Sequence, residues 1–122
     1  MPISLNHTIV PAYDKEASAK HIAHILGLTC KESMGHFAPV QVDDKLTLDF
    51  DNREAFESHH YAFHVSDEEF DDIFHRIEEE KVVYGSLPTS QEDMQINNRR
   101  GGRGLYFKDA NGHSWEILTR SA

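Results

Sequence analysis

The chain has 122 residues, a length typical of one domain with a single hydrophobic core. Hydrophobic residues make up 39% and charged residues 27%, which excludes the disordered and fibrous classes of protein. The formal net charge of −9 argues against nucleic acid or an anionic membrane surface as the main partner, because like charges repel. We therefore expect one folded domain, residues 1–122.

Two further exclusions concern location and cysteine chemistry. No apolar run approaches the roughly 20 residues that cross a bilayer, and the first residues lack the pattern of a secretory signal, so the cytoplasm is the expected location. Cys30 is the only cysteine, which excludes an intramolecular disulfide and a cysteine-rich zinc site.

The first elements predicted are a strand and a helix. Alternating apolar residues predict a strand that ends at Pro11 and presents His7 on its apolar side. The residues that define this side are Ile3, Leu5, His7 and Ile9. Asp14 can cap the following helix and Gly27 can end it. The apolar stripe of that helix is expected at Ala19, Ile22, Ala23 and Leu26.

A predicted hairpin, with strands over 37–42 and 46–50, separates this helix from a second strand and helix. The second strand–helix pair begins with a strand over 60–65. Ser66 and Glu69 then have the spacing of a capping box, which predicts the start of an amphipathic helix. Its buried stripe is expected at Phe70, Ile73, Phe74 and Ile77.

The last third of the chain predicts a short strand, a long polar loop and a hairpin. The strand covers 82–84 and the loop covers 85–104. Asn-Gly is a strong turn signal, so the strands over 105–107 and 114–119 are expected to be joined by a turn at 109–112.

The two halves of the chain have the same order of elements. His7 lies seven residues before Asp14, at the start of the first helix, and His60 lies seven residues before Asp67, at the start of the second. We therefore predict an α+β fold of paired βαβββ modules, in which each helix covers one face of its sheet and the free faces form a half-barrel metal cleft. The modules would span about residues 1–52 and 57–122.

Side-chain alternation gathers metal-binding groups on these free faces. On the strand over 60–65, His60 and His64 project to the open side, where His7 would also lie if a twofold axis relates the modules. Glu116 points away from its hydrophobic neighbours, and a buried carboxylate is unfavourable without a cation. Two histidines and one carboxylate form the facial arrangement of non-haem iron and other divalent metals, which predicts His7, His60 and Glu116 as ligands.

Three other residues are candidates for the chemistry around the metal. Tyr106 is expected on the strand next to Glu116, where its phenol can act as a proton donor and catalytic group. His64 can be a further ligand, a hydrogen-bonding neighbour of a ligand or a cavity residue that meets the substrate. The arginines of 98–104 suit a lid for an anionic substrate or an ordinary loop, with Arg103 the best placed for substrate binding. The remaining histidines are expected to be solvated: His21, His24, His36, His59, His75 and His113.

At these residues the sequence resembles the vicinal oxygen chelate superfamily, which includes glyoxalases, bleomycin-resistance proteins and extradiol dioxygenases. The matching stretches are Leu5 to His7, His60 to Phe63, and Gly104 to Glu116, of which the last is the most specific. The resemblance implies paired βαβββ modules and a metal held by His7, His60 and Glu116. Many single-domain members are homodimers with metal sites at a shared interface, so His7 can come from a partner chain.

Three differences from members of this superfamily narrow the reaction. Glyoxalase I supplies a fourth ligand from the strand before the linker, where residues 45–49 contain no glutamate, so a three-ligand site is favoured. Fosfomycin-modifying relatives have a threonine at the position of Ile9 and an arginine beyond the last residue here, which disfavours fosfomycin. Extradiol dioxygenases use two histidines and a glutamate on iron with a nearby tyrosine, although most are longer chains.

We expect an enzyme that uses a divalent ion (Fe, Mn, Ni or Zn) to chelate vicinal oxygens of a small-molecule substrate. Dioxygenase-like chemistry leads, and glyoxalase-like lyase or isomerase chemistry follows. The alternative is a metal-free, dimeric protein of the bleomycin-resistance type that sequesters a drug in the same fold. Retention of all three ligands favours the enzyme. A homodimer is expected, with no role for nucleic acid or a membrane.

Overall fold

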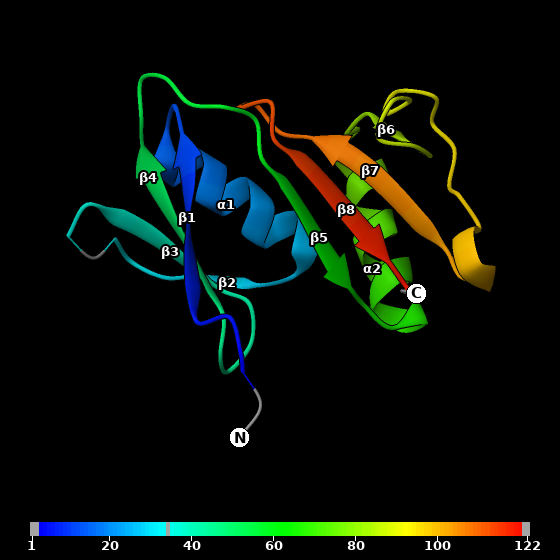
Figure 1. Ribbon diagram of the computed structural model, residues 1–122, viewed down its shortest axis with the longest axis horizontal. Coiled ribbons are helices and arrows are strands. Elements are labelled where there is room, and N and C mark those ends of the chain that lie inside the picture. Colours follow the sequence, from blue (N-terminus) through cyan, green and yellow to red (C-terminus); the bar gives the residue numbers. More distant parts are fainter. Residues whose placement is uncertain (1–2, 34, 121–122) are drawn as a thin grey trace. The chain divides into compact units, whose positions relative to one another are not determined.

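The computed structural model describes residues 3–33 and 35–120. The chain divides into two compact units, one ending at Glu57 and the other beginning at Ser58. Each unit runs as a strand, a helix and three further strands (Figure 1). The predicted α+β fold of paired βαβββ modules is therefore confirmed. Within the described residues, no helix has the length and apolar character needed to cross a bilayer.

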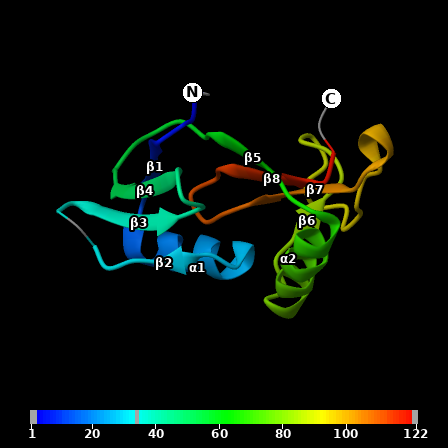
Figure 2. The ribbon, with the colours of Figure 1, turned by 90° about the horizontal axis from the view of Figure 1, so that it is seen from below.

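The first unit is a four-stranded mixed sheet with one helix against it. Its elements are β1 (His7–Ala12), α1 (Lys15–Leu26), β2 (Thr29–Cys30), β3 (Phe37–Gln41) and β4 (Thr47–Asn52). The strand order is β1-β4-β3-β2, with β1 parallel to β4 and the other pairs antiparallel. Helix α1 lies along one face of this sheet (Figure 2) and contributes Ala19, Ile22 and Ile25 to the buried core.

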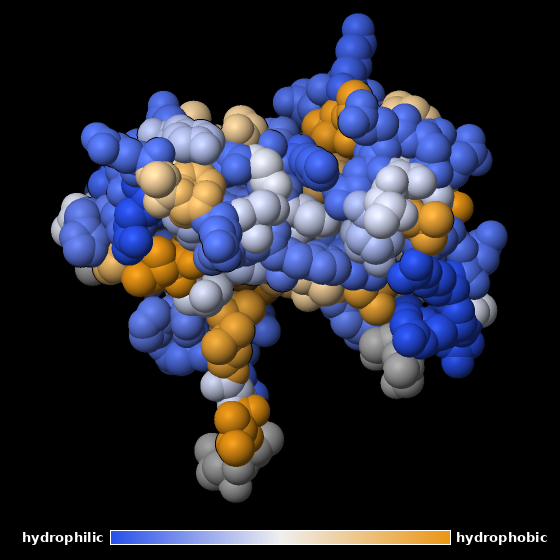
Figure 3. Space-filling view, turned by 45° about the horizontal axis from the view of Figure 1, so that its top comes forward, coloured by the Kyte–Doolittle hydropathy of each residue, from blue (hydrophilic) through white to orange (hydrophobic). Residues whose placement is uncertain are grey.

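Strand β1 differs from the prediction at both ends. It begins at His7 rather than Ile3, and the earlier residues Ile3 and Leu5 are 101% and 64% exposed. Apolar surface accordingly projects at the lower edge of Figure 3. The strand also continues through Pro11 to Ala12. The proline is tolerated because β1 is the end strand of its sheet, where a backbone N–H can be missing without breaking the ladder.

The second unit repeats the arrangement. Its elements are β5 (His60–His64), α2 (Asp67–Glu79), β6 (Tyr84–Gly85), the short 3-10 helix η1 (Arg99–Gly101), β7 (Gly104–Lys108) and β8 (Ser114–Leu118). The strand order is β5-β8-β7-β6, with β5 parallel to β8. Helix α2 begins with the predicted capping box, in which Ser66 and Glu69 each accept a hydrogen bond from the other's backbone N–H.

The two faces of the second sheet have different roles. On one face, which α2 covers, Tyr61 and Phe63 stack on Trp115 with ring centroids 4.7 and 6.1 Å apart. We call the opposite face of this sheet the open face. The backbone register places Ala62, Glu116 and Tyr106 in one row across it. This alternation therefore separates the aromatic core from the candidate site, as the sequence predicts.

Candidate functional site

The central pair of the site is His60 and Glu116, on neighbouring parallel strands. Glu116 of β8 is in register with Ala62 of β5, and His60 lies two residues before Ala62 on the same face. The distance from His60 Nε2 to Glu116 Oε1 is 3.0 Å. The His60 side chain is 48% exposed and that of Glu116 is 17% exposed, so a ligand can approach from the imidazole side.

The separation of these two atoms fits a shared metal ion. Two donors bound at right angles, each about 2.1 Å from one ion, lie about 3.0 Å apart. Imidazole nitrogen and carboxylate oxygen are also donors that suit Fe, Mn, Ni and Zn. Within residues 3–33 and 35–120, no group of three His, Cys, Asp or Glu side chains is placed to hold a metal. A metal ion bound by this pair would therefore need at least one further donor.

His7 belongs to the first unit, at the start of β1, and is exposed. Its Nδ1 lies 2.7 Å from Asn6 Oδ1. Because an amide oxygen only accepts hydrogen bonds, this contact places the ring proton on Nδ1 and leaves Nε2 as an acceptor. An imidazole in that tautomer is prepared to bind a metal through Nε2. His7 pairs with Thr47 in its sheet as His60 pairs with Ser114, so the two histidines hold equivalent positions in their units.

Tyr106 lies beside the His60–Glu116 pair on the open face. It is in register with Glu116, its ring centroid is 5.9 Å from that of His60, and it is 2% exposed. Arg99 Nη1 donates a hydrogen bond to the phenol oxygen at 3.1 Å. Burial raises the pKa of Tyr106, and the hydrogen bonding and charge of Glu116 raise it further against the opposing charge of Arg99. The phenol is therefore neutral at pH 7 and able to donate a proton.

Arg103 has partners within the protein. Its Nη1 donates to Asp71 Oδ1 at 2.7 Å, its Nη2 lies 3.1 Å from Asp67 Oδ1, and its Cζ lies 4.5 Å from the centre of the Phe70 ring. These contacts tie the start of β7 to the first turns of α2. Arg99, which the sequence analysis did not single out, is the arginine that reaches Tyr106 on the open face. The acidic pair Asp67 and Asp71, one turn apart on α2, was the available signal that Arg103 would be engaged elsewhere.

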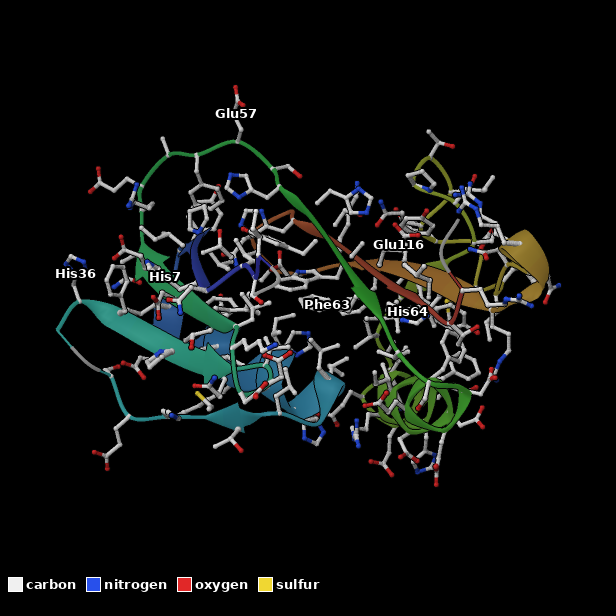
Figure 4. The ribbon with its side chains drawn as sticks, turned by 60° about the horizontal axis from the view of Figure 1, so that its bottom comes forward. His7, His36, Glu57, Phe63, His64 and Glu116 are labelled. Atoms are coloured by element: carbon white, nitrogen blue, oxygen red, sulfur yellow. The ribbon has the colours of Figure 1, made fainter. Side chains whose placement is uncertain are left out.

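His64 lies on the same face of β5 as His60, on the side of the strand opposite Phe63 (Figure 4). Its Nε2 lies 2.9 Å from the carbonyl oxygen of Thr119, which can only accept, so His64 donates from Nε2. The backbone after β8 therefore positions this ring. Its contact with substrate stays a prediction.

The prediction that His113 is solvated is wrong. The residue is fully buried, and its Nδ1 accepts a hydrogen bond from the backbone N–H of His59 at 2.9 Å. Its own backbone N–H donates to the Asp109 carboxylate in the predicted turn. The sequence did contain the signal, because His113 alternates with Trp115 and Ile117 and so shares their buried face.

Relatives of the chain are found among solved structures, whereas no family model and no curated protein matches it. A structure named Oxidase ChaP-H2 is 48% identical, with a TM-score of 0.93 and coverage of 99% of this chain and 96% of that chain. Oxidase ChaP-H1 is 46% identical, with a TM-score of 0.92 and 98% of each chain covered. A glyoxalase/dioxygenase from Nostoc punctiforme shares the fold at 22% identity, with a TM-score of 0.71 over 98% of this chain and 92% of that chain.

The similarity to the two oxidases extends over nearly the whole chain and includes both βαβββ units. The fold is also that of a protein described as a glyoxalase/dioxygenase. On the open face, His60 and Glu116 are also in contact, and both belong to the sequence motifs described above. The chain therefore belongs to the vicinal oxygen chelate superfamily.

Proposed function

We propose that the protein is a metal-dependent enzyme that binds a small substrate through two neighbouring oxygen atoms, at a divalent ion held by His7, His60 and Glu116. The contact of 3.0 Å between His60 Nε2 and Glu116 Oε1, beside a neutral Tyr106, carries the proposal. A bound ion supplies positive charge that stabilises a substrate enolate or catecholate. The names of the two most identical relatives described above, both oxidases, support oxidative chemistry over lyase or isomerase chemistry.

The side chains have separate tasks in this proposal. Glu116 contributes a carboxylate whose position is fixed by the β5–β8 pairing. Tyr106 donates its phenolic proton, or a hydrogen bond, to a substrate oxygen that becomes negative during the reaction. Asn6 keeps His7 in the tautomer that presents Nε2. His64 contacts the substrate from the far end of β5.

The proposal extends to the setting in which the enzyme works. We place the chain in the cytoplasm, as one domain of two modules that forms a homodimer. In such a dimer His7 can come from the same chain or from its partner. A small molecule is the substrate, and neither nucleic acid nor a membrane takes part.

The metal is tested by replacing one proposed ligand. His60→Ala removes an imidazole from the pair, so the purified protein should lose most of the divalent metal that the unchanged protein keeps after extensive dialysis. His75→Ala is the matched control, because His75 is an exposed residue of α2 whose only recorded side-chain partner in the described chain is Glu79. Elemental analysis measures metal per chain in all three proteins.

Equal metal content in the unchanged protein and His60→Ala would refute the proposed centre. Oxygen consumption with a catechol, measured on Fe(II)-loaded protein, would separate oxidative chemistry from the lyase alternative. A compound that binds metal-free protein tightly, with no turnover by any metal-loaded form, would instead favour a sequestering protein.

A further inference from the structure

We infer that Arg99 is the anion-binding residue of the site and that the substrate carries a carboxylate a short distance from its two metal-binding oxygens. This inference rests on the proposed function, because it assigns the substrate class of that same face. Arg99 begins η1 in the segment between β6 and β7. Its Nη1 donates to the Tyr106 phenol at 3.1 Å, and its Cζ lies 6.0 Å from the centre of the Tyr106 ring.

The guanidinium of Arg99 lacks a negative partner in the described part of the chain. Its recorded side-chain partner is a phenol, which is neutral at pH 7. By contrast, Arg53 is paired with Asp51 at 2.9 Å, and Arg103 is paired with two aspartates. A guanidinium has five N–H donors, and the phenol takes one of them. Most of the hydrogen-bonding capacity of Arg99, and all of its charge, is therefore available to a ligand.

The position of Arg99 links this free charge to the proposed centre. Tyr106 is in register with Glu116, and Glu116 contacts His60 at 3.0 Å. One phenol therefore separates the Arg99 guanidinium from the pair that would hold the ion. A substrate held there by two oxygens would bring a carboxylate on the same small molecule within reach of Arg99.

Neighbouring cations strengthen the preference for an anion. Arg100 follows Arg99, and a Cβ placed on Gly101 would lie 3.6 Å from Nη1 of Arg120, so the Arg120 guanidinium lies against this turn. Both arginines are exposed, and neither has a recorded ion pair within residues 3–33 and 35–120. Three arginines without an ion pair among the described residues, in a chain of net charge −9, form a local field that attracts anions. The deep blue area at the lower right of Figure 3 shows strongly hydrophilic surface on this side of the second unit.

The backbone around Arg99 is held in place by close contacts. Asn97 Oδ1 accepts a hydrogen bond from the Arg99 N–H at 3.2 Å. A Cβ on Gly102 would lie 2.7 Å from Thr119 Oγ1, and a Cβ on Gly104 would lie 2.9 Å from Asn97 Oδ1, so the chain packs tightly on both sides of the turn. A residue fixed before binding loses less conformational entropy when the ligand arrives. A planar carboxylate also matches the two parallel N–H groups that a guanidinium presents.

The test compares 3,4-dihydroxybenzoate with its methyl ester, a neutral catechol that keeps both hydroxyl groups and replaces the carboxylate by a slightly larger ester. Isothermal titration calorimetry on metal-loaded protein should show about tenfold tighter binding of the acid, as expected for a charge-assisted hydrogen bond. Arg99→Gln should abolish this preference and leave the affinity for the ester unchanged, whereas Arg99→Lys should keep part of it. Arg53→Gln is the matched control and should keep the full preference, because Arg53 already has Asp51 as its partner.

A full preference for the acid in Arg99→Gln would overturn the inference. A failure of the proposed metal centre gives a different result, because the ester would then bind equally well to the protein with and without metal. If neither catechol binds, benzoate and benzamide are titrated into metal-free protein and followed by NMR. Benzoate shifts that are equal in the unchanged protein and Arg99→Gln, or absent from both, would also overturn the inference.

Discussion

At the scale of single residues, the phenol of Tyr106 is controlled by two opposite charges. Burial is the main cause that raises the pKa of the phenol; Glu116 raises it further, and Arg99 opposes both effects. The proton therefore stays on the oxygen until a substrate oxygen becomes basic enough to take it. A residue held in this way suits a general acid better than a base.

Tyr106→Phe isolates that proton, because the ring and its packing remain. We expect turnover to fall by roughly a hundredfold or more while metal content stays unchanged. The measurement is kcat on an active substrate together with elemental analysis. Tyr13→Phe is the matched control, since Tyr13 is 61% exposed in the first unit and its ring centroid lies 4.8 Å from that of Phe56 in a tilted arrangement. Full turnover by Tyr106→Phe would remove the phenol from the mechanism and leave the metal ligands in place.

At the scale of elements, helix α2 begins with two reciprocal hydrogen bonds. The Ser66 hydroxyl accepts from the Glu69 N–H at 3.1 Å, and the Glu69 carboxylate accepts from the Ser66 N–H at 2.8 Å. The second bond and the hydroxyl of Ser66 lower the pKa of Glu69. These bonds satisfy backbone donors that the first turn of a helix leaves without partners.

Ser66→Ala removes one of these acceptors and should lower the free energy of unfolding by about 1 kcal/mol. Urea denaturation followed by circular dichroism measures the change. Ser4→Ala is the control, because Ser4 is exposed and precedes the first strand. Equal midpoints for Ser66→Ala and the unchanged protein would show that the cap contributes nothing to stability.

Elements defined by local chemistry were predictable, and contacts between distant side chains were not. Helix α2 follows from its apolar period and capping box, both of which lie within one segment. In α1 the same apolar period predicts Leu26 in the buried stripe, but Leu26 is only partly buried and its neighbour Ile25 is fully buried. For the site, alternation along β5 and β8 correctly places His60 and Glu116 on one face. The contacts of Arg103 with Asp71 and Asp67 join residues that are 32 and 36 positions apart, so no local pattern predicts them, and substrate binding by Arg103 stays a prediction.

At the scale of the whole molecule, each unit has a sheet whose end strand carries a proposed metal ligand. β1 bears His7 and β5 bears His60, and each stands at the end of its strand order. End strands present backbone groups that can pair with another chain. A second copy is one means of protecting them, and closed twofold pairs are the commonest soluble assemblies.

We therefore expect a homodimer in solution. Size-exclusion chromatography with light scattering should give twice the mass of the chain across micromolar concentrations. His7→Ala should leave this mass unchanged, because it removes a ligand without altering the backbone of β1. A monomer at every concentration would contradict the expected assembly.

The glycines near the η1 turn (Arg99–Gly101) also determine which substitutions this part of the protein can accept during evolution. A Cβ on Gly85 would lie 1.9 Å from the Ser90 carbonyl oxygen, whereas a Cβ on Gly102 or Gly104 would meet the side chains of Thr119 and Asn97 at 2.7 and 2.9 Å. Arg99 and Arg100, in contrast, have exposed side chains. A substitution at Gly85 would clash with the backbone, whereas a substitution at Arg99 or Arg100 would change the charge presented to a ligand and, at Arg99, the hydrogen bond to Tyr106. Single substitutions at the arginines can thus change which anion the protein binds while the fold is kept. Specificity and fold can therefore evolve separately in related proteins.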